Sequence, residues 1–471
     1  MKILRRHLLV FLIVDLMYYL RMNAQGGYTL EPIMQNLDVP VRFAFAPDGS
    51  GRIFYLELLT GNVRVIDSDS SRDLWLHVNS SSEIERGLLG IAFDSQFSDN
   101  RYVYIFYTTQ ADTPANRVER YTEVNGRADT SSRMLLFEQT VMTPCGISTR
   151  HNGGALTFGT DGKLHISFGE NNCPQLAADT TDPRGKILRI EPHIPAPNNA
   201  VVTNPFYDDG NPFTGNDDRI YAKGFRNPFG MTLSLFDSTI FVTENGPDCN
   251  DEINRVLPGH DYGWREECQT GPDHCNCSQS FPFTPPLWSI TPTIAPTGLI
   301  VYNGSLYPEL YARVIFVDWV EGKIRAGTLS PMNDSLTVTV ISSATGGSLL
   351  DVVQGPDGYM YFSTYDAIWR LLPQQTDIVE NTTHPRTVLL QNHPNPFNPK
   401  TDLRFEIGDW SYVSLKVYDV FGKETATLVD EKKSPGSYSV TWDANGMPSG
   451  VYFYRLMTQS FQDTKKMILL K

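Results

Sequence analysis

The chain has 471 residues and a formal net charge of −14 at pH 7, and 41% of its residues are hydrophobic. A chain of this length and apolar content can bury a large core and form two or three domains, which excludes an intrinsically disordered protein. The acidic balance and the lack of a basic stripe after the first few residues predict no nucleic-acid partner, because that function requires clustered Lys and Arg.

The N-terminus predicts a secretory signal peptide. A basic segment at residues 1–7 precedes an apolar run at residues 8–20, and Ala24 provides a small residue for cleavage. A permanent membrane anchor is the alternative, but Asp15 interrupts the run, which is also shorter than the roughly 20 residues needed to cross a bilayer. We therefore expect residues 1–24 to be removed, and no integral membrane segment in the mature protein.

A repeated hairpin pattern follows. Three clear copies consist of two alternating apolar runs joined by Asp-Gly, a strong hairpin signal, and their turns lie at Asp48-Gly49, Asp161-Gly162 and Asp357-Gly358. Three weaker copies lie at residues 91–107, 231–243 and 298–318. The irregular spacing, roughly 45 to 75 residues, is at or above the period of propeller blades. We expect residues 25–373 to be all-β and to form a six-bladed β-propeller.

The cysteines form an even set in the middle of the chain: Cys145, Cys173, Cys249, Cys268, Cys275 and Cys277. This usage predicts disulfides in an oxidising compartment, although the sequence does not determine their connectivity. A zinc site at residues 268–277 is the alternative, but the Cys and His residues there are too crowded and lack a second well-spaced pair.

Four short motifs occur in order through the middle of the chain. They are HNGG at residues 151–154, FRNPFG at 225–230, ENGP at 244–247, and DEIN with DYGW within 251–264. Each motif lies next to a strand-like run, where functional side chains are often exposed. Their residue types therefore need a chemical interpretation.

His151 can act as a base near neutral pH, and Arg226 offers a planar charged group that can stabilise an anion. Asp248, Asp251 and Glu252 provide hard oxygen atoms that suit calcium better than zinc, and predict a calcium-bearing loop. The structural alternatives are a buried histidine without catalytic function, an ordinary Arg-Asn-Pro turn and a solvent-facing acidic loop.

In this order, the four motifs resemble the active-site face of the soluble quinoprotein sugar dehydrogenases. These form the glucose/sorbosone dehydrogenase family, which also contains Hedgehog-interacting-protein-like domains. The resemblance covers about residues 39–372 and implies the same propeller. It also implies oxidation of the anomeric hydroxyl of an aldose or related sugar, with hydride transfer to pyrroloquinoline quinone (PQQ).

The resemblance further implies roles for individual residues. His151 would take the proton of the anomeric hydroxyl, and Arg226, beside Asn227, would stabilise the quinone oxyanion. The carbonyls of Gly246 and Pro247 would hold a calcium ion that polarises the cofactor.

The metal expectation extends to a second ion. Glu252 and Tyr262 resemble ligands of a structural calcium in the same family.

The positions that should hold the cofactor carboxylates depart from the family pattern, which has a Gln, a Lys and two Arg. Here Glu85, Glu321, Ser348 and Leu350 match them. Each lost charge-assisted hydrogen bond would cost about 1.5 to 3 kcal/mol unless nearby cations compensate. The candidates for compensation are Arg86, Lys323 and Arg325. Two functions stay open: a sugar dehydrogenase, and a non-catalytic calcium-containing propeller that binds carbohydrate or protein at the cell surface.

The C-terminal part reads as a separate module. Residues 374–390 have a linker composition, and residues 391–471 contain alternating runs typical of a small Ig-like β-sandwich. The segments NPFNP, KVYDVFG, GSYSVTWDA and GVYFYRL resemble the sorting domain of type IX secretion substrates. An ordinary sandwich without a sorting role is the alternative. The resemblance implies a protein that the type IX machinery exports across the outer membrane of a Gram-negative bacterium, secreted or held at the cell surface.

Overall fold

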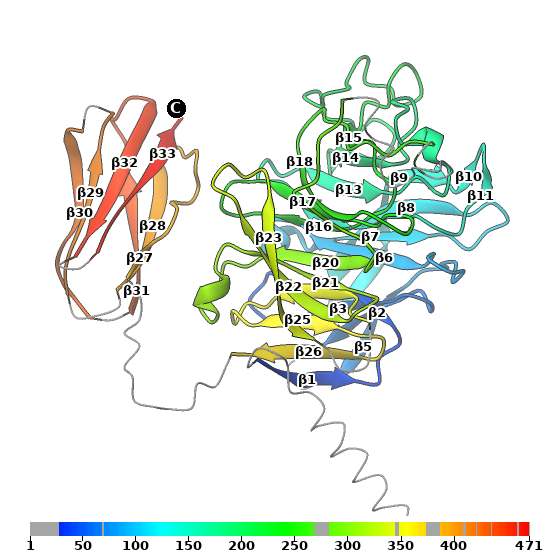
Figure 1. Cartoon of the computed structure of the whole chain (residues 1–471), viewed down its shortest axis with the longest axis horizontal. Coiled ribbons are helices and arrows are strands. Elements are labelled where there is room, and N and C mark those ends of the chain that lie inside the picture. Colours follow the sequence, from blue (N-terminus) through cyan, green and yellow to red (C-terminus); the bar gives the residue numbers. More distant parts are fainter. Residues whose placement is uncertain are drawn as a thin grey trace, which may run out of the picture. The chain divides into compact units, whose positions relative to one another are not determined.

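The computed structural model describes residues 28–67, 70–266, 268, 282–343, 348–373, 387–407, 411–420, 422–434, 436–458 and 461–470. The chain divides into two compact units, Met1–Gln375 and Thr376–Lys471 (Figure 1). The expected signal peptide and most of the expected linker lie outside the described residues. In the described part of the chain, no helix has the length and apolar character needed to cross a membrane.

The described part of the first unit forms six four-stranded antiparallel sheets, each in chain order except where β1 joins the last. The first two are β2 (Pro40–Phe45), β3 (Ile53–Glu57), β4 (Asn62–Ile66), β5 (Arg72–His77); and β6 (Leu88–Phe93), β7 (Tyr102–Thr108), β8 (Ala115–Val124), β9 (Arg127–Thr140). The next two are β12 (Leu156–Phe158), β13 (Leu164–Phe168), β14 (Lys186–Ile190), β15 (Ile220–Lys223); and β16 (Pro228–Leu233), β17 (Ile240–Glu244), β18 (Asp251–Val256), β19 (Trp288–Ile290). The last two are β20 (Pro296–Val301), β21 (Val314–Asp318), β22 (Lys323–Leu329), β23 (Leu336–Ser343); and β24 (Asp351–Gln354), β25 (Met360–Ser363), β26 (Ala367–Leu372), β1 (Thr29–Gln35).

All six hairpins expected from the sequence are present as antiparallel pairs. Each pair is formed by the first two strands of a sheet, such as β2 with β3 and β12 with β13. Short additional elements lie in the connections: the helix α2 (Phe97–Asn100), the 3-10 helices η1 (Pro174–Leu176) and η3 (Pro308–Leu310), and the hairpin of β10 (Met142–Thr143) and β11 (Gly146–Ile147).

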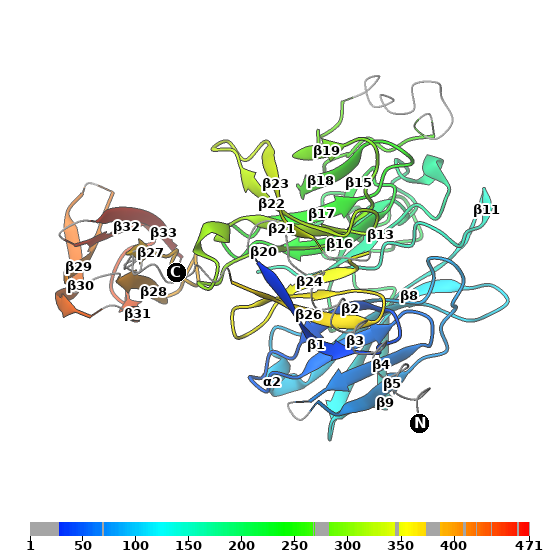
Figure 2. The same ribbon diagram turned by 60° about the horizontal axis from the view of Figure 1, so that its bottom comes forward.

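The first strands of the six sheets form a closed ring. β2 contacts β6, and contacts continue through β12, β16, β20 and β24 back to β2. The sheets follow one another in chain order, and the first lies beside the last (Figure 2). Apolar side chains fill the space between neighbouring sheets, so each sheet is stabilised by the two beside it.

A buried ion pair connects strands at the centre of the ring. Arg42 on β2 lies 3.1 Å from Asp351 on β24, and it donates to the carbonyls of Phe229 on β16 (2.8 Å) and Leu89 on β6 (3.4 Å). One guanidinium therefore joins four of the six sheets. A charged pair this well hydrogen-bonded favours one arrangement of the sheets, because removing either partner leaves a buried charge uncompensated.

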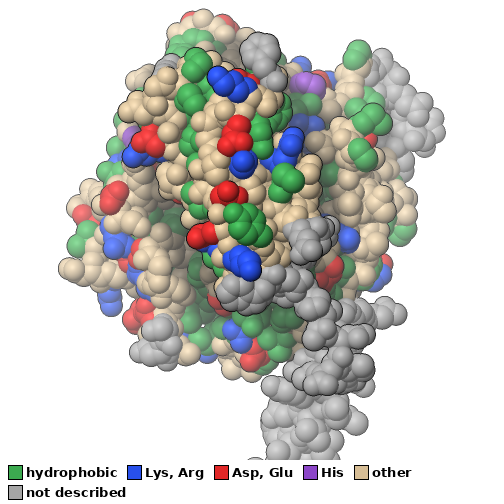
Figure 3. All heavy atoms as spheres, turned by 90° about the vertical axis from the view of Figure 1, so that its left-hand side faces the viewer, with side chains coloured by type: hydrophobic (Ala, Val, Ile, Leu, Met, Phe, Trp, Pro, Cys, Tyr) green, Lys and Arg blue, Asp and Glu red, His purple; other side chains and the backbone are tan. Residues whose placement is uncertain are grey.

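The second unit contains two sheets with a core of their own. One is β27 (Val388–Leu389), β28 (Lys400–Ile407) and β31 (Gly436–Asp443); the other is β30 (Glu424–Lys433), β29 (Ser411–Tyr418), β32 (Gly450–Met457) and β33 (Gln462–Leu469). The buried side chains between them include Phe405, Leu415, Trp442 and Tyr454. Basic and acidic side chains are mixed on the face that Figure 3 shows, without a large patch of either sign.

Candidate functional site

His151 sits in a tightly held turn before β12. Its backbone has a φ of 56°, in the left-handed region, and the two following glycines also have positive φ. The His151 N–H donates to the Glu85 carboxylate (2.7 Å), and its carbonyl accepts from both the backbone and side-chain nitrogens of Asn171 (3.1 Å each). A non-glycine residue in this conformation is costly, so the turn persists because its neighbours fix it.

The side chain of His151 pairs with Glu170, a fully buried residue just after β13. His151 Nδ1 lies 2.5 Å from Glu170 Oε1. Because an ionised carboxylate only accepts hydrogen bonds, we place the proton on Nδ1, which leaves Nε2 as the acceptor. Within the described residues Nε2 has no hydrogen-bond partner. The arrangement resembles the carboxylate-oriented histidine of general-base catalysts.

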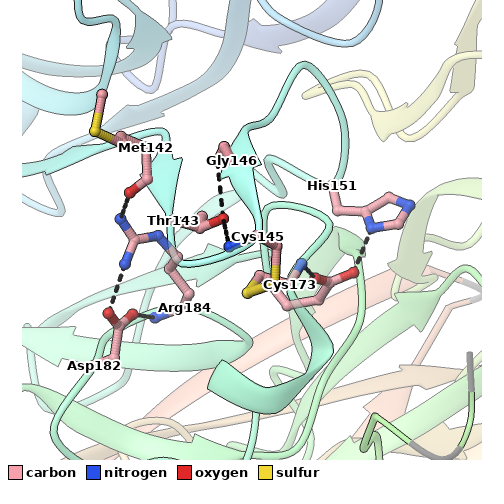
Figure 4. Close-up of a disulfide and its surroundings, with 9 residues drawn as sticks. Met142, Thr143, Cys145, Gly146, His151, Cys173, Asp182 and Arg184 are labelled. Carbon is pink, nitrogen blue, oxygen red and sulfur yellow. Dashed lines mark hydrogen bonds and ion pairs between the residues drawn. A yellow bond between two sulfur atoms is a disulfide. The ribbon is translucent and has the colours of Figure 1, made fainter.

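Glu170 is held by main-chain donors and by a disulfide. Its second carboxylate oxygen accepts from the N–H of Cys173, which forms a disulfide with Cys145 across a separation of 28 residues (Figure 4). The Glu170 N–H donates to the carbonyl of Arg226 (2.9 Å). The disulfide therefore fixes the segment that orients His151. No role was predicted for Glu170; its position directly after a strand and a glycine is the signal that could have found it.

The other cysteines agree in part with the prediction. Cys249 and Cys268 are disulfide-bonded, which argues against the zinc alternative, and no described cysteine is free. Cys275 and Cys277 lie outside the described residues.

Arg226 lies at the wall of a cavity of about 60 Å³. Its side chain donates to the carbonyl of Asn245 (2.8 Å) and lies 5.5 Å from the ring centre of Trp264, and burial lowers its pKa. The N–H groups of Arg226 and Asn227 both donate to Glu244 Oε1 (2.5 and 3.0 Å). Because Arg226 lines the cavity, its positive charge can stabilise an anion there.

A hydrogen bond links the cavity to the histidine turn. Asn227 Oδ1 accepts from the N–H of Gly153 (3.1 Å). Of the residues expected from the sequence, the structure places Arg226, Gly246, Pro247, Glu252 and Tyr262 around the cavity. His151, Glu85 and Asn227 form a second cluster beside it, connected through Glu170 and Gly153.

One buried and one partly buried carboxylate make the cavity suitable for a cation. Glu244 on β17 and Glu252 on β18 are directly opposite each other in the sheet, and both line the cavity. Burial, followed by the charge of Glu252, raises the pKa of Glu244 to about 8; burial raises that of Glu252 to about 7. Glu244 Oε2 is buried and has no partner among the described residues. This unsatisfied oxygen, with Glu252 and the main chain of Gly246 and Pro247, forms an all-oxygen donor set that fits calcium.

The expected calcium-bearing loop at residues 248–262 is partly wrong. Residues 251–256 form β18, because most side chains of this segment are buried and the backbone pairs with β17. Both oxygens of Asp251 accept main-chain N–H groups, from Gly246 (2.8 Å), Ile294 (2.5 Å) and Ala295 (2.7 Å). Asp251 therefore ties the Gly246 segment down. Neither Asp248 nor Asp251 lines the cavity.

The hydroxyl of Tyr262 is engaged within the fold. It donates to the carbonyl of Arg255 (2.5 Å) and accepts from the N–H of Leu257 (2.8 Å). If Tyr262 contributes to an ion site, the main chain is the part that remains for it.

The positions expected to hold PQQ carboxylates do not supply cations. Glu321 pairs with Lys323 (3.0 Å) and with Arg325, which also pairs with the buried Asp318. Leu350 is buried and apolar, and Ser348 carries no charge. Lys323 and Arg325, the expected compensating cations, are already occupied by these acidic partners.

Arg86, the third compensating candidate, is also engaged: it donates to the carbonyl of Ser148 and pairs with Glu83 (2.7 Å). The Glu85 carboxylate accepts from the His151 turn. The residues present therefore fit a calcium ion, but they do not fit the carboxylate groups of PQQ.

Comparison with known proteins decides the family. Residues 37–372 match the model of the Glucose / Sorbosone dehydrogenase family. The chain belongs to this family. Residues 392–470 match the Secretion system C-terminal sorting domain, so the protein is exported, and is secreted or held at the cell surface.

The curated relatives include enzymes and a binding protein. Aldose sugar dehydrogenase YliI of Escherichia coli is 26% identical, covering 74% of this chain and 93% of the relative. Quinoprotein glucose dehydrogenase B of Acinetobacter calcoaceticus is 27% identical over 49% of this chain and 51% of its own. The human Hedgehog-interacting protein is 23% identical over 51% of this chain and 38% of its own.

Solved structures support the fold. A structure from Thermus thermophilus described as a glucose dehydrogenase is 26% identical with a TM-score of 0.61, covering 74% of this chain and all of that one. The apo-form of the soluble aldose sugar dehydrogenase from Escherichia coli is 23% identical with a TM-score of 0.64, covering 74% of this chain and 99% of that one. These neighbours are sugar dehydrogenase propellers, so the first unit is a propeller.

Proposed function

We propose that this protein is an exported dehydrogenase that oxidises the anomeric hydroxyl of an aldose or a related sugar. The observation that carries the proposal is the His151–Glu170 pair, in which Nδ1 is oriented by a buried carboxylate and Nε2 has no partner among the described residues. The six sheets are then the six blades of the propeller, and the C-terminal unit is an Ig-like sorting sandwich handled by the type IX secretion machinery of a Gram-negative bacterium.

His151 takes the proton of the sugar hydroxyl at Nε2. Glu170 keeps the imidazole in the required tautomer and stabilises the imidazolium that forms, as expected for a general base worth about 100- to 10,000-fold in rate. Arg226 lies in the adjacent cavity wall, where a buried guanidinium stabilises negative charge more strongly than it would in water.

Calcium and the electron acceptor need separate treatment. Glu244, Glu252, Gly246 and Pro247 would hold a calcium ion, which would supply Lewis acidity in the cavity. PQQ is the acceptor that the family implies, but the side chains that should pair with its carboxylates are Glu321, Ser348 and Leu350. We therefore derive no step through PQQ.

A second function is favoured by this mismatch. A calcium-containing propeller without redox chemistry would bind carbohydrate or protein at the cell surface and would not need cations at these positions. The pairing of Arg325 and Lys323 with Asp318 and Glu321 supports this candidate, because two positive and two negative charges balance without a ligand.

Dye reduction by the purified full-length protein with calcium, tested with and without PQQ across a panel of aldoses, separates the two functions. A dehydrogenase shows sugar-dependent reduction that His151→Gln abolishes, while the exposed His77→Gln leaves it unchanged. No reduction under any condition, together with calcium-dependent sugar or protein binding, contradicts the dehydrogenase and supports the binding propeller.

The missing cations provide a second arm of the same experiment. Glu321→Lys with Ser348→Arg restores two positive charges, and we expect this variant to bind PQQ at least ten-fold more tightly than the wild type, since each charge-assisted bond contributes about 1.5 to 3 kcal/mol. Tight PQQ binding by the wild type would show instead that other residues hold the cofactor.

A further inference from the structure

A second acidic cluster lies in the connection between β14 and β15, away from the Gly246 cavity. Asp208, Asp209 and Asp218 each present a carboxylate oxygen, and these oxygens all lie within 4.8 Å of one another. Asp208 and Asp209 are exposed, whereas Asp218 is fully buried. Acidic clusters are common on protein surfaces, so the exposed aspartates alone do not indicate a binding site. The evidence for one comes from the buried Asp218.

One oxygen of Asp218 has no partner. Its Oδ1 accepts from the N–H of Asp208 (2.5 Å), but Oδ2 is buried without a hydrogen bond in the described structure. Burial raises the pKa of this carboxyl, as do the charges of Asp208 and Asp209. An unsatisfied buried carboxylate oxygen among two other carboxylates is costly unless something positive lies between them.

The neighbouring basic side chains are committed to other acids. Arg219 pairs with Asp217 (2.6 Å), and Arg189 pairs with Asp161 (2.5 Å). Among the described residues, none of the three clustered aspartates has a salt bridge to Lys, Arg or His. The basic side chains in the described part of the chain therefore do not neutralise the cluster.

The loop holds the carboxylates in place. Asp209 accepts from the Asn211 N–H (2.8 Å) and the Thr214 hydroxyl (2.6 Å). Asp208 Oδ2 accepts from the Asn216 N–H (2.9 Å) and from its amide nitrogen (3.2 Å).

Gly215 allows this close approach. A Cβ atom there would lie 2.3 Å from Asp208 Oδ2, and its φ of 65° also favours glycine. The exposed edge of the cluster leaves a path for an ion to enter.

We propose that the loop of residues 208–218 binds a calcium ion through Asp208, Asp209 and Asp218. An all-oxygen donor set of carboxylates on an irregular loop suits calcium, which tolerates variable geometry, better than zinc, which prefers nitrogen and sulfur. This site is distinct from the Glu244–Glu252 cavity and does not depend on the proposed dehydrogenase activity.

Terbium luminescence tests the site in the full-length protein, because terbium replaces calcium and is excited through nearby aromatic rings. Tyr207 is suited to this because it lies next to the loop: a Cβ atom at Gly210 would be only 2.8 Å from its hydroxyl. We expect tyrosine-sensitised terbium emission, which should decrease when calcium displaces terbium. Tyr207→Phe should lower this emission without changing calcium binding, which equilibrium dialysis measures.

Two variants identify the ligands. Asp218→Asn and the exposed Asp209→Asn are each expected to weaken calcium binding at this site at least ten-fold and to reduce the bound calcium by one ion per chain. Asp237→Asn, an aspartate on another loop, is the matched control and should leave both unchanged. Because Asp209 is at the surface, its variant tests the site even if Asp218→Asn misfolds.

Limited proteolysis provides an independent readout. Phe213, in the same loop, is 75% exposed, so chymotrypsin can reach it. Calcium should slow cleavage after Phe213 at least five-fold in the wild type and in Glu252→Gln, but not in Asp209→Asn. Full calcium stoichiometry and unchanged terbium emission in Asp209→Asn would overturn the proposal, as would loss of the Phe213 protection in Glu252→Gln.

Discussion

Glu170 orients His151 through a 2.5 Å hydrogen bond, and the backbone N–H of the same glutamate donates to the carbonyl of Arg226. The base and the anion-stabilising cation are thus connected through one buried residue. A shift of the Glu170 segment would move both groups, so their geometry depends on the disulfide that holds Cys173.

Glu170→Gln is expected to lower kcat by about 100-fold with little change in KM, because an amide keeps the shape but loses the charge that stabilises the imidazolium. Sugar-dependent dye reduction measures the effect. Glu123→Gln makes the same change at a buried glutamate paired with Arg52, and should leave kcat unchanged. Equal losses in the two variants would show that Glu170 acts only on stability.

Removal of calcium is expected to lower the melting temperature of the wild type. Glu244 and Glu252 face each other across β17 and β18. A cation that binds between them would stabilise the fold by about 2.7 kcal/mol when its free concentration is 100 times its Kd. Differential scanning calorimetry with and without chelator measures this effect. In Glu252→Gln, the decrease in melting temperature caused by chelator should be smaller, because the cavity no longer binds calcium. Glu191→Gln, which changes a glutamate paired with Lys163, should show the same decrease as the wild type. An identical chelator response in wild type and Glu252→Gln would contradict the cavity site.

His165 is expected to make the propeller sensitive to acid. Burial lowers the pKa of this histidine from 6.5 to about 4, so between these values the unfolded chain binds a proton that the folded chain does not. The contribution of His165 to the free energy of unfolding is therefore lost as pH falls from about 6.5 to about 4, by about 3 kcal/mol in total, and this contribution does not change further below that range. Urea unfolding at several pH values in this range should show that the free energy of unfolding of the wild type decreases as pH falls, and that the decrease is smaller in His165→Gln. An equal decrease in the two proteins would show that His165 does not titrate as its burial implies.

Deletion of everything after Arg386 is expected to leave the propeller folded but not exported to the surface. Each unit has its own core, so the melting temperature of the propeller should change by no more than about 1 °C. Surface labelling in a host with type IX secretion measures delivery. If the truncated protein still reaches the surface, the C-terminal unit is not the export signal.

The local parts of the fold were predictable because they depend on neighbouring residues. Asp-Gly turns between alternating apolar runs identify the hairpins β2–β3, β12–β13 and β24–β25, and all three are present. In the C-terminal unit, alternating runs predicted β29, β31 and β32 for the same reason. Strands of this kind can be predicted from the alternation of apolar and polar side chains along the sequence.

The contacts that complete the site were less accessible. Glu170 lies 19 positions from its partner His151, and the Arg42–Asp351 pair spans 309 positions, so the sequence around each of these residues does not reveal its partner. The strand character of residues 251–256 was hidden by the acidic residues that suggested a loop. Glu244, although it belongs to the ENGP motif, was given no role, because only the sheet register brings it opposite Glu252.

The last sheet of the propeller is made from both ends of the first unit, since β1 pairs with β26 as its outermost strand, with Leu30 opposite Leu371. During synthesis, residues 29–35 therefore wait without their partner strand until residue 372 has left the ribosome. A chain that stops before β26 cannot complete the last sheet, because β26 lies between β1 and β25 and both would keep an open strand edge. The last sheet is therefore completed only when nearly all of the propeller has been made.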